Sequence, residues 1–177
     1  TNAYLVELTT SVLTRSDPLL MIHDLQRYVS THLACECVVD IRGDALEHGH
    51  RSDAHAQLSV EESEGEERDR RRRVELLSTF APLIDQVLSH DRSTAVGVDV
   101  EALRSDDLIV PEAEALTRKL APNVDWIVAA PIHTGGTAAG ALVLFGATAR
   151  RAPLATDLVE RLATRLGAAI DNGRMYA

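Results

Sequence analysis

Aromatic side chains are scarce in this chain of 177 residues, where Phe, Trp and Tyr make up only 3% of the sequence. The hydrophobic core must therefore be built mainly from Ala, Val, Leu and Ile, within an apolar fraction of 45%. That fraction argues against a chain that is disordered throughout, because such disorder requires low hydrophobicity together with high net charge. The length favours a single domain with one sizeable core.

Long apolar runs are also missing, since no stretch reaches the roughly 20 residues that a membrane-spanning helix needs. The first residues, 1–13, contain Glu7 and no basic head, so a secretory signal is not expected. Cysteine is limited to Cys35 and Cys37. On one strand these two are too far apart for an easy disulfide, and a reducing cytosol is the simplest compartment. We therefore expect a cytoplasmic protein.

Positive charge is in deficit, because 18 Lys and Arg residues oppose 27 Asp and Glu residues and give a formal net charge of −9. An acidic surface repels the phosphates of nucleic acids and of anionic membranes, so we expect neither as a partner of this domain. The basic run Arg70–Arg73 follows an acidic stretch at 61–67. An acidic stretch followed by a basic one along a helix is typical of a solvated helix face, and we interpret the arginine run in that way.

The spacing of apolar residues predicts a mixture of helices and strands. Helices are expected at 3–15, 18–33, 61–90, 112–120 and from 156 onward, and strands at 35–42, 54–60 (weak), 94–100, 125–133 and 138–147. Pro82 is expected to kink or split the third helix. Gly135 and Gly136 indicate a hairpin turn, and hence antiparallel pairing. We expect an α+β fold (an α/β sandwich) with a central antiparallel sheet of five or six strands, flanked by helices, in which the N- and C-terminal helices pack together.

The last third of the chain carries a recognisable set of motifs. An apolar strand ending Ala-Ala-Pro-Ile at 129–132 precedes the glycine turn, and the return strand continues Ala-Gly-Ala-Leu-Val-Leu at 139–144. The closing run at 168–176 reads AAIDNGRMY. These segments resemble the central hairpin and final helix of GAF domains, and residues 33–40 look like the first GAF strand. The resemblance spans nearly the whole chain and is sharpest over 124–177.

The resemblance implies one sensory domain over 1–177, with lead-in helices at 1–33, the sheet and its covering helices at 34–149, and an exit helix at 155–177. It also implies a non-catalytic regulatory domain in signal transduction. Such a domain binds a small molecule or mediates dimerisation, and it relays a signal to an output domain. The Ala- and Arg-rich character is similar to GAF domains of actinobacterial multidomain regulators, including regulators of transcription. Their outputs are typically phosphatase, histidine kinase or ANTAR domains.

An alternative is a small-molecule or thiol-redox enzyme on a GAF scaffold, with Cys35 and Cys37 as the reactive pair. The competing interpretation places both as small core side chains on one face of a strand. His48, His50 and His55 match metal-ligand spacing loosely, but they stand in a polar stretch that is better explained as a solvated loop. No Ser-His-Asp set and no phosphate-binding loop is discernible, so we expect no enzyme activity, no cofactor and no metal.

Two sets of residues are candidate functional positions. Trp126 and Val128 share one face of a strand, and the indole could stack on a small ligand beneath a cover formed by 103–120. The alternative is that Trp126 simply fills the core. The terminal helices carry apolar stripes that fit the seam of a homodimer, or that cover the sheet of the same chain. These seam candidates are Leu5, Leu8, Val12, Leu158, Leu162 and Leu166.

Overall fold

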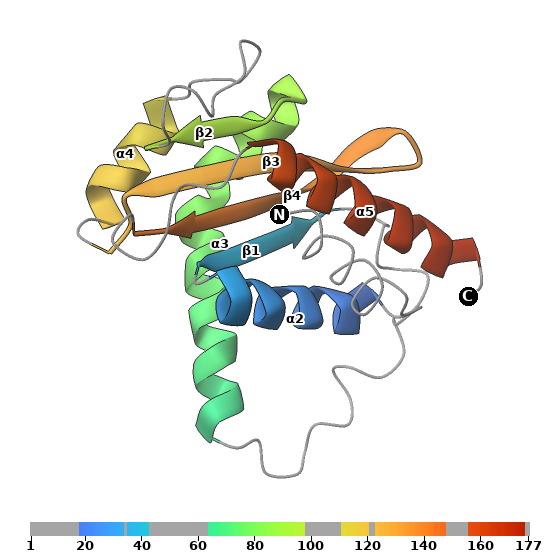
Figure 1. Ribbon diagram of the computed structural model, residues 1–177, viewed down its shortest axis with the longest axis horizontal. Coiled ribbons are helices and arrows are strands. Elements are labelled where there is room, and N and C mark those ends of the chain that lie inside the picture. Colours follow the sequence, from blue (N-terminus) through green and yellow to red (C-terminus); the bar gives the residue numbers. More distant parts are fainter. Residues whose placement is uncertain are drawn as a thin grey trace.

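The computed structural model describes residues 18–33, 35–42, 64–97, 111–120, 123–147 and 156–175. Its elements follow in the order shown in Figure 1: α2 (Pro18–Tyr28), the short π-helix η1 (Val29–Leu33), β1 (Glu36–Ile41), α3 (Glu64–His90), β2 (Thr94–Val96), α4 (Pro111–Leu120), β3 (Trp126–Thr134), β4 (Thr137–Gly146) and α5 (Thr156–Met175). The predicted helix 3–15, the weak strand 54–60 and the three loop histidines lie outside the described residues.

Every helix and strand that was predicted within the described ranges is present, with two differences. The helix α3 runs unbroken past Pro82, so the predicted split is wrong. Pro82 is exposed, and the backbone hydrogen bond that it cannot donate is lost on the solvent side of the helix. The described part of the sheet has four strands, whereas five or six were predicted.

The sheet is antiparallel at every described pairing and has the order β1-β4-β3-β2. The two longest strands form its centre through the hairpin at Gly135 and Gly136, whose φ angles of 57° and 81° suit glycine. Strand β1 pairs only with β4 among the described strands, so its other side is an edge of the described sheet.

Helices cover both faces of the sheet, which gives three layers (Figure 1). Residues Val128, Ala130 and Ile132 of β3 point toward α2 and α5, whereas Ile127 and Ala129 point toward α3 and α4. This separation follows from the two-residue period of a strand. The predicted α+β sandwich is confirmed, and α2 and α5 contact each other on the same face.

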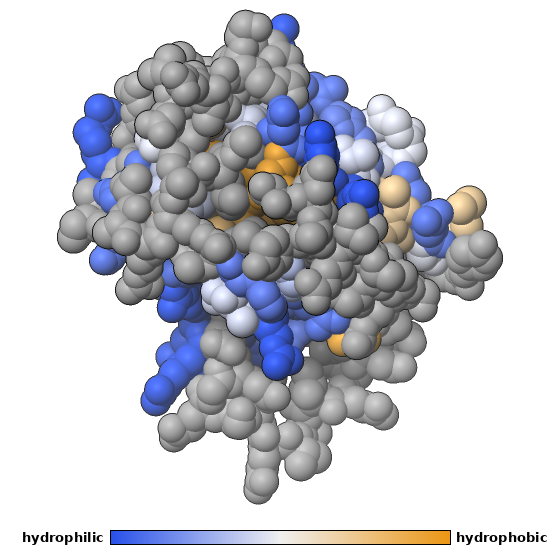
Figure 2. Space-filling view, viewed as in Figure 1, coloured by the Kyte–Doolittle hydropathy of each residue, from blue (hydrophilic) through white to orange (hydrophobic). Residues whose placement is uncertain are grey.

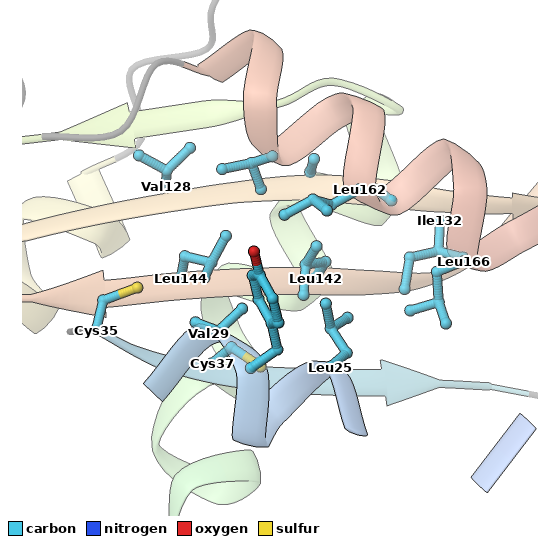
Figure 3. Packing of buried hydrophobic residues seen from close by; sticks show 14 of the residues in the cluster. Leu25, Val29, Cys35, Cys37, Val128, Ile132, Leu142, Leu144, Leu162 and Leu166 are labelled. Atoms are coloured by element: carbon cyan, nitrogen blue, oxygen red, sulfur yellow. The ribbon is translucent and has the colours of Figure 1, made fainter. Parts of the chain in front are cut away.

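The core is built almost entirely from aliphatic side chains, as the composition predicts. Figure 3 shows how Leu25 of α2 and Val29 of η1 meet Leu142 and Leu144 of β4, while Leu162 approaches from α5. The opposite face holds the aromatic pair Phe80 and Phe145, whose ring centroids lie 4.7 Å apart. Within the described part of the chain, no helix is long and apolar enough to cross a bilayer.

Candidate functional site

Trp126 and Val128 both lie inside the core on the α2/α5 face, where they are 2% and 0% exposed. Gly146, paired with Trp126 across the strands, provides the room for the indole, since a Cβ there would come within 3.0 Å of the ring. The position of Trp126 matches the core-filling alternative. Among the described residues its Nε1 has no hydrogen-bond partner, so the ring is held by packing.

The prediction that residues 103–120 cover the Trp126 face is wrong for the part of that segment that the structure describes. In the segment 103–120 the described part is α4, which packs Leu116 and Leu120 on the opposite side of the sheet. The alternation places Ile127 toward α4, and therefore Trp126 toward α2 and α5. Sequence periodicity identifies two faces of a strand without saying which helix will cover each one.

A groove of about 890 Å³ follows the edge of β1 between α2 and α3. Its walls come from the two helices, and its floor comes from β1 and the neighbouring strand ends. The helix residues that line it are His23, Gln26 and Arg27 on α2, Ser30 on η1, and Arg72, Arg73 and Leu76 on α3. The floor is formed by Cys35 to Val39, Asn123, Val124 and Phe145 to Ala147.

The groove is cationic although the whole chain is acidic. Of the three arginines in its lining, Arg72 donates two hydrogen bonds to the carboxylate of Glu36, at 2.7 and 2.6 Å. Within the described part of the chain, Arg27 and Arg73 make no ion pair or hydrogen bond. Glu36 is the one carboxylate in the described lining, so two positive charges remain without a balancing charge there.

The sequence missed this site because a run of arginines usually marks a solvated helix face. That interpretation holds, because Arg70 to Arg73 are all exposed, and Arg71 pairs with Glu67 one turn earlier at 2.8 Å. Arg70 also approaches Glu67, at 3.8 Å. Arg72 and Arg73 line the groove from α3, and only the packing of α3 on the sheet brings them to the same groove as Arg27 of α2.

The thiols of Cys35 and Cys37 are buried and face the same side of β1, as predicted (Figure 3). Burial raises the pKa of the Cys37 thiol to about 12, and the nearby Cys35 and Glu36 add to the shift. The thiol is therefore protonated at neutral pH, whereas nucleophilic and metal-binding chemistry needs the thiolate. The described residues contain no group of three His, Cys, Asp or Glu side chains that could hold a metal ion.

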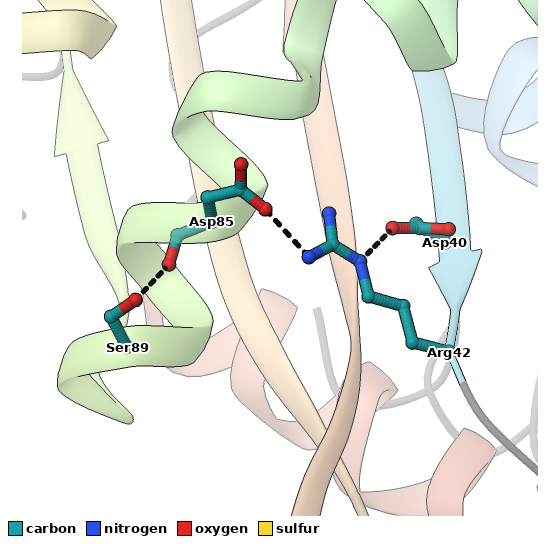
Figure 4. Close-up of polar contacts among 4 residues, drawn as sticks. All are labelled: Asp40, Arg42, Asp85 and Ser89. Atoms are coloured by element: carbon teal, nitrogen blue, oxygen red, sulfur yellow. Dashed lines mark hydrogen bonds and ion pairs between the residues drawn. The ribbon is translucent and has the colours of Figure 1, made fainter.

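Polar contacts fix the end of β1 to α3. Figure 4 shows Arg42 donating to Asp85 on α3 at 2.5 Å and to Asp40 on its own strand at 2.9 Å. The hydrogen bond to Asp85, followed by that to Asp40, raises the pKa of the Arg42 guanidinium. All of these side chains are partly or largely exposed, so the pairs contribute little to stability.

Helix α5 is coupled closely to the central hairpin. Its Gly167 lies against β3, where a Cβ would come within 2.1 Å of the carbonyl oxygen of His133. One turn later Asp171 accepts hydrogen bonds from the backbone N–H of Gly135 in the hairpin turn, at 3.0 and 3.2 Å. The backbone of the exit helix is thereby held to the strand and to the turn that follows it.

The leucines predicted as a dimer seam on α5 pack within the chain. Leu162 and Leu166 are 2% and 0% exposed in the cluster between α5 and the sheet, and the partly buried Leu158 packs against the same cluster. This is the alternative in which the stripe covers the chain's own sheet. Leu5, Leu8 and Val12 lie outside the described residues. Any partner of α5 must therefore contact its other face, which carries Thr164, Arg165 and Ala168.

The three-layer fold is shared with part of a chemotaxis protein. Residues 122 to 287 of a methyl-accepting chemotaxis protein match with a TM-score of 0.53 and 16% identity, over 96% of this chain and 98% of that one. The GAF domain of A. aeolicus nlh2, in an inactive state, aligns over 99% of this chain and 93% of its own, with 14% identity. Its TM-score of 0.44 is too low to support an argument.

Comparisons of sequence add no relative. No protein-family model matches the chain, and no curated protein matches it. The shared fold with the chemotaxis protein fragment is therefore what the comparisons establish.

Proposed function

We propose that this chain is a non-catalytic GAF-type sensory domain of a cytoplasmic signalling protein. In this proposal it takes up a small molecule or mediates homodimerisation, and it relays its state to an output domain of the phosphatase, histidine kinase or ANTAR type. The sequence motifs at 127–144 and 168–176 support the family, and their Ala- and Arg-rich setting supports an actinobacterial-type regulator. The fold shared with a chemotaxis protein fragment is consistent with that role.

The observation that carries the proposal is the attachment of α5 to the hairpin. Gly167 brings the helix backbone against β3, and Asp171 accepts from the backbone of the hairpin turn. A shift of the central strands must therefore move α5 or break these contacts, because packed elements move as units. Because α5 is joined to the hairpin in this way, it is the route that we propose for a change in the sheet to leave the domain.

The homodimer is tested by light scattering of the full chain at several protein concentrations. We expect a dimer that uses the exposed face of α5, and we expect Ala168→Glu on that face to shift the equilibrium to monomer. The matched control is Ala115→Glu, at an exposed alanine of α4. A parent chain that is monomeric at the highest concentration, or a dimer lost equally in both variants, would show that this surface is not the seam.

The relay is tested by hydrogen exchange of α5. A ligand or partner that binds elsewhere on the domain should change the protection of α5 amides near Gly167 and Asp171. Unchanged protection of α5 upon saturable binding would contradict the relay, although it would leave the binding itself intact.

A further inference from the structure

We propose that the groove along the edge of β1 binds a small organic anion, namely a carboxylate or phosphate group carried on an apolar body. Trp126 does not line this groove. The site deepens the proposed function, because it rests on a sensory role that requires a ligand. Its walls are α2 and α3, and its floor is β1 with the ends of the neighbouring strands. The groove's volume of about 890 Å³ lies within the range of small-molecule pockets, roughly 300–1,000 Å³.

The charged part of the ligand is indicated by the arginines. Arg27 projects from α2 and Arg73 from α3, so the two cations come from opposite walls of one groove. Both lack a partner within the described part of the chain, whereas the neighbouring Arg72 is held by Glu36. A guanidinium presents a planar set of donors that matches carboxylate and phosphate oxygens. The local charge is opposite to the net charge of −9, which makes an anion the complementary ligand.

The apolar part of the ligand is indicated by the floor. Val38, Val124, Phe145 and Leu76 line the groove together with the buried thiols of β1. These side chains offer no charge to a ligand, and a neutral thiol behaves as a small hydrophobic group. An inorganic anion would leave this surface unused, whereas an aliphatic chain or ring attached to the anionic group would cover it.

The groove borders elements that lead to α5. Its α2 wall belongs to the same packed cluster as α5 and the sheet, since Leu25 and Val29 meet the leucines of that cluster (Figure 3). Gly146 lines the groove and also lies against the indole of Trp126. Binding in the groove should therefore alter the fluorescence of Trp126, which is the chain's single tryptophan.

The helix residues that line the groove are mostly hydrophilic. Among the described residues visible in Figure 2, hydrophilic side chains predominate and hydrophobic ones appear only in small areas. The run Arg70–Arg73 and the exposed Arg27 contribute to this character on α3 and α2. An anion approaching this side of the domain meets arginines before it reaches the apolar floor.

The test is a titration of the full chain, followed by Trp126 fluorescence and by calorimetry, at low ionic strength. The probes are octanoate, octyl phosphate, inorganic phosphate and uncharged octanol. We expect octanoate or octyl phosphate to bind, and the difference between these two identifies the preferred anionic group. Inorganic phosphate tests charge without an apolar body, and octanol tests an apolar body without charge, so both should bind much more weakly.

Three variants make the test specific to the groove. Arg27→Gln and Arg73→Gln should each weaken binding about ten-fold, the size expected when one charge-assisted hydrogen bond is lost. Glu36→Gln should strengthen binding, because it removes the carboxylate in the lining and releases Arg72. Arg118→Gln, at an exposed arginine of α4 that does not line the groove, is the matched control and should bind as the parent does.

Several outcomes would overturn the proposal. These are the absence of binding by either alkyl anion, octanol binding as tightly as octanoate, or arginine variants that match the Arg118→Gln control. Circular dichroism of each variant confirms that the fold is retained, as expected for exposed side chains. If the groove proposal is overturned, the dimer and relay tests of the proposed function are unaffected. Conversely, specific binding without any change in α5 protection would support the site and contradict the relay.

Discussion

Asp171 on α5 accepts hydrogen bonds from the backbone N–H of Gly135, across a separation of 36 residues in the sequence. The carboxylate thereby satisfies a donor in the hairpin turn that the turn itself leaves available. This contact joins the tip of the central hairpin to the exit helix. It is the simplest place at which to ask whether the two move together.

Replacing Asp171 by Ala should release the hairpin tip while leaving the fold intact. We expect faster hydrogen exchange of the Gly135 amide and a loss of at most about 1 kcal/mol in the free energy of unfolding. Asn172→Ala, at the exposed neighbouring position, is the control and should leave that amide unchanged. Equal exchange rates at Gly135 in the two variants would mean that the carboxylate does not hold the turn in solution.

Gly167→Ala should destabilise the protein although alanine is the better helix former. The added Cβ would meet the carbonyl oxygen of His133 at 2.1 Å, so α5 must move away from β3. Overpacking of this kind costs about 1–3 kcal/mol, which outweighs the gain of roughly 1 kcal/mol in helix propensity. The measurement is urea denaturation, and Thr164→Ala on the exposed face of α5 should raise stability by about 0.5 kcal/mol or less. A stabilised Gly167→Ala protein would contradict the close approach.

Leu166→Ala should cost about 2–5 kcal/mol, because the side chain is fully buried between α5 and the sheet. A residue whose main contact were with a second chain would behave differently. Its loss would weaken dimerisation and leave the stability of the monomer nearly unchanged. Urea denaturation at low protein concentration, together with light scattering, separates the two cases.

The Cys37 thiol should make the protein less stable at alkaline pH. Its pKa is raised from 9.0 to about 12 in the folded protein, so the unfolded chain loses this proton first. The stabilising effect is therefore complete below pH 9 and declines as the pH rises from 9 toward 12. Between pH 8 and pH 10, the free energy of unfolding should fall by about 1 kcal/mol less in the Cys37→Ala variant than in the parent protein.

The same thiol offers a test of the enzyme alternative. A protonated buried thiol should react slowly with iodoacetamide at pH 8 in the folded protein and rapidly after unfolding. Fast modification of the native chain, or a turnover abolished by Cys37→Ser, would revive the thiol-redox alternative.

Trp126 should emit at short wavelength and be protected from iodide, because it is 2% exposed. Trp126→Phe should lower the free energy of unfolding by less than Leu144→Ala does, for which a loss of about 2–5 kcal/mol is expected. The reason is that the indole N–H has no partner among the described residues, so removing it relieves a desolvation cost. Strong quenching of the native protein by iodide would show that the ring is accessible to solvent.

The sequence by itself determined the local structure and the faces of the strands. A strand has a period of two, so the alternation of Cys35, Cys37 and Val39 assigns them to one face whatever packs against it. The glycine pair at 135 and 136 likewise fixes the hairpin, because both positions have positive φ. Apolar spacing located the helices for the same reason, since their residues repeat every three to four positions.

Only the tertiary structure decided what each face meets. Pattern alone allowed Leu162 and Leu166 to contact either a partner or the chain's own sheet, and packing placed them on the sheet. It also placed Arg73 of α3 and Arg27 of α2, which are 46 positions apart, on opposite walls of one groove. Such neighbours depend on how helices dock on a sheet, which is set by the summed burial of many side chains and leaves no local mark on the sequence.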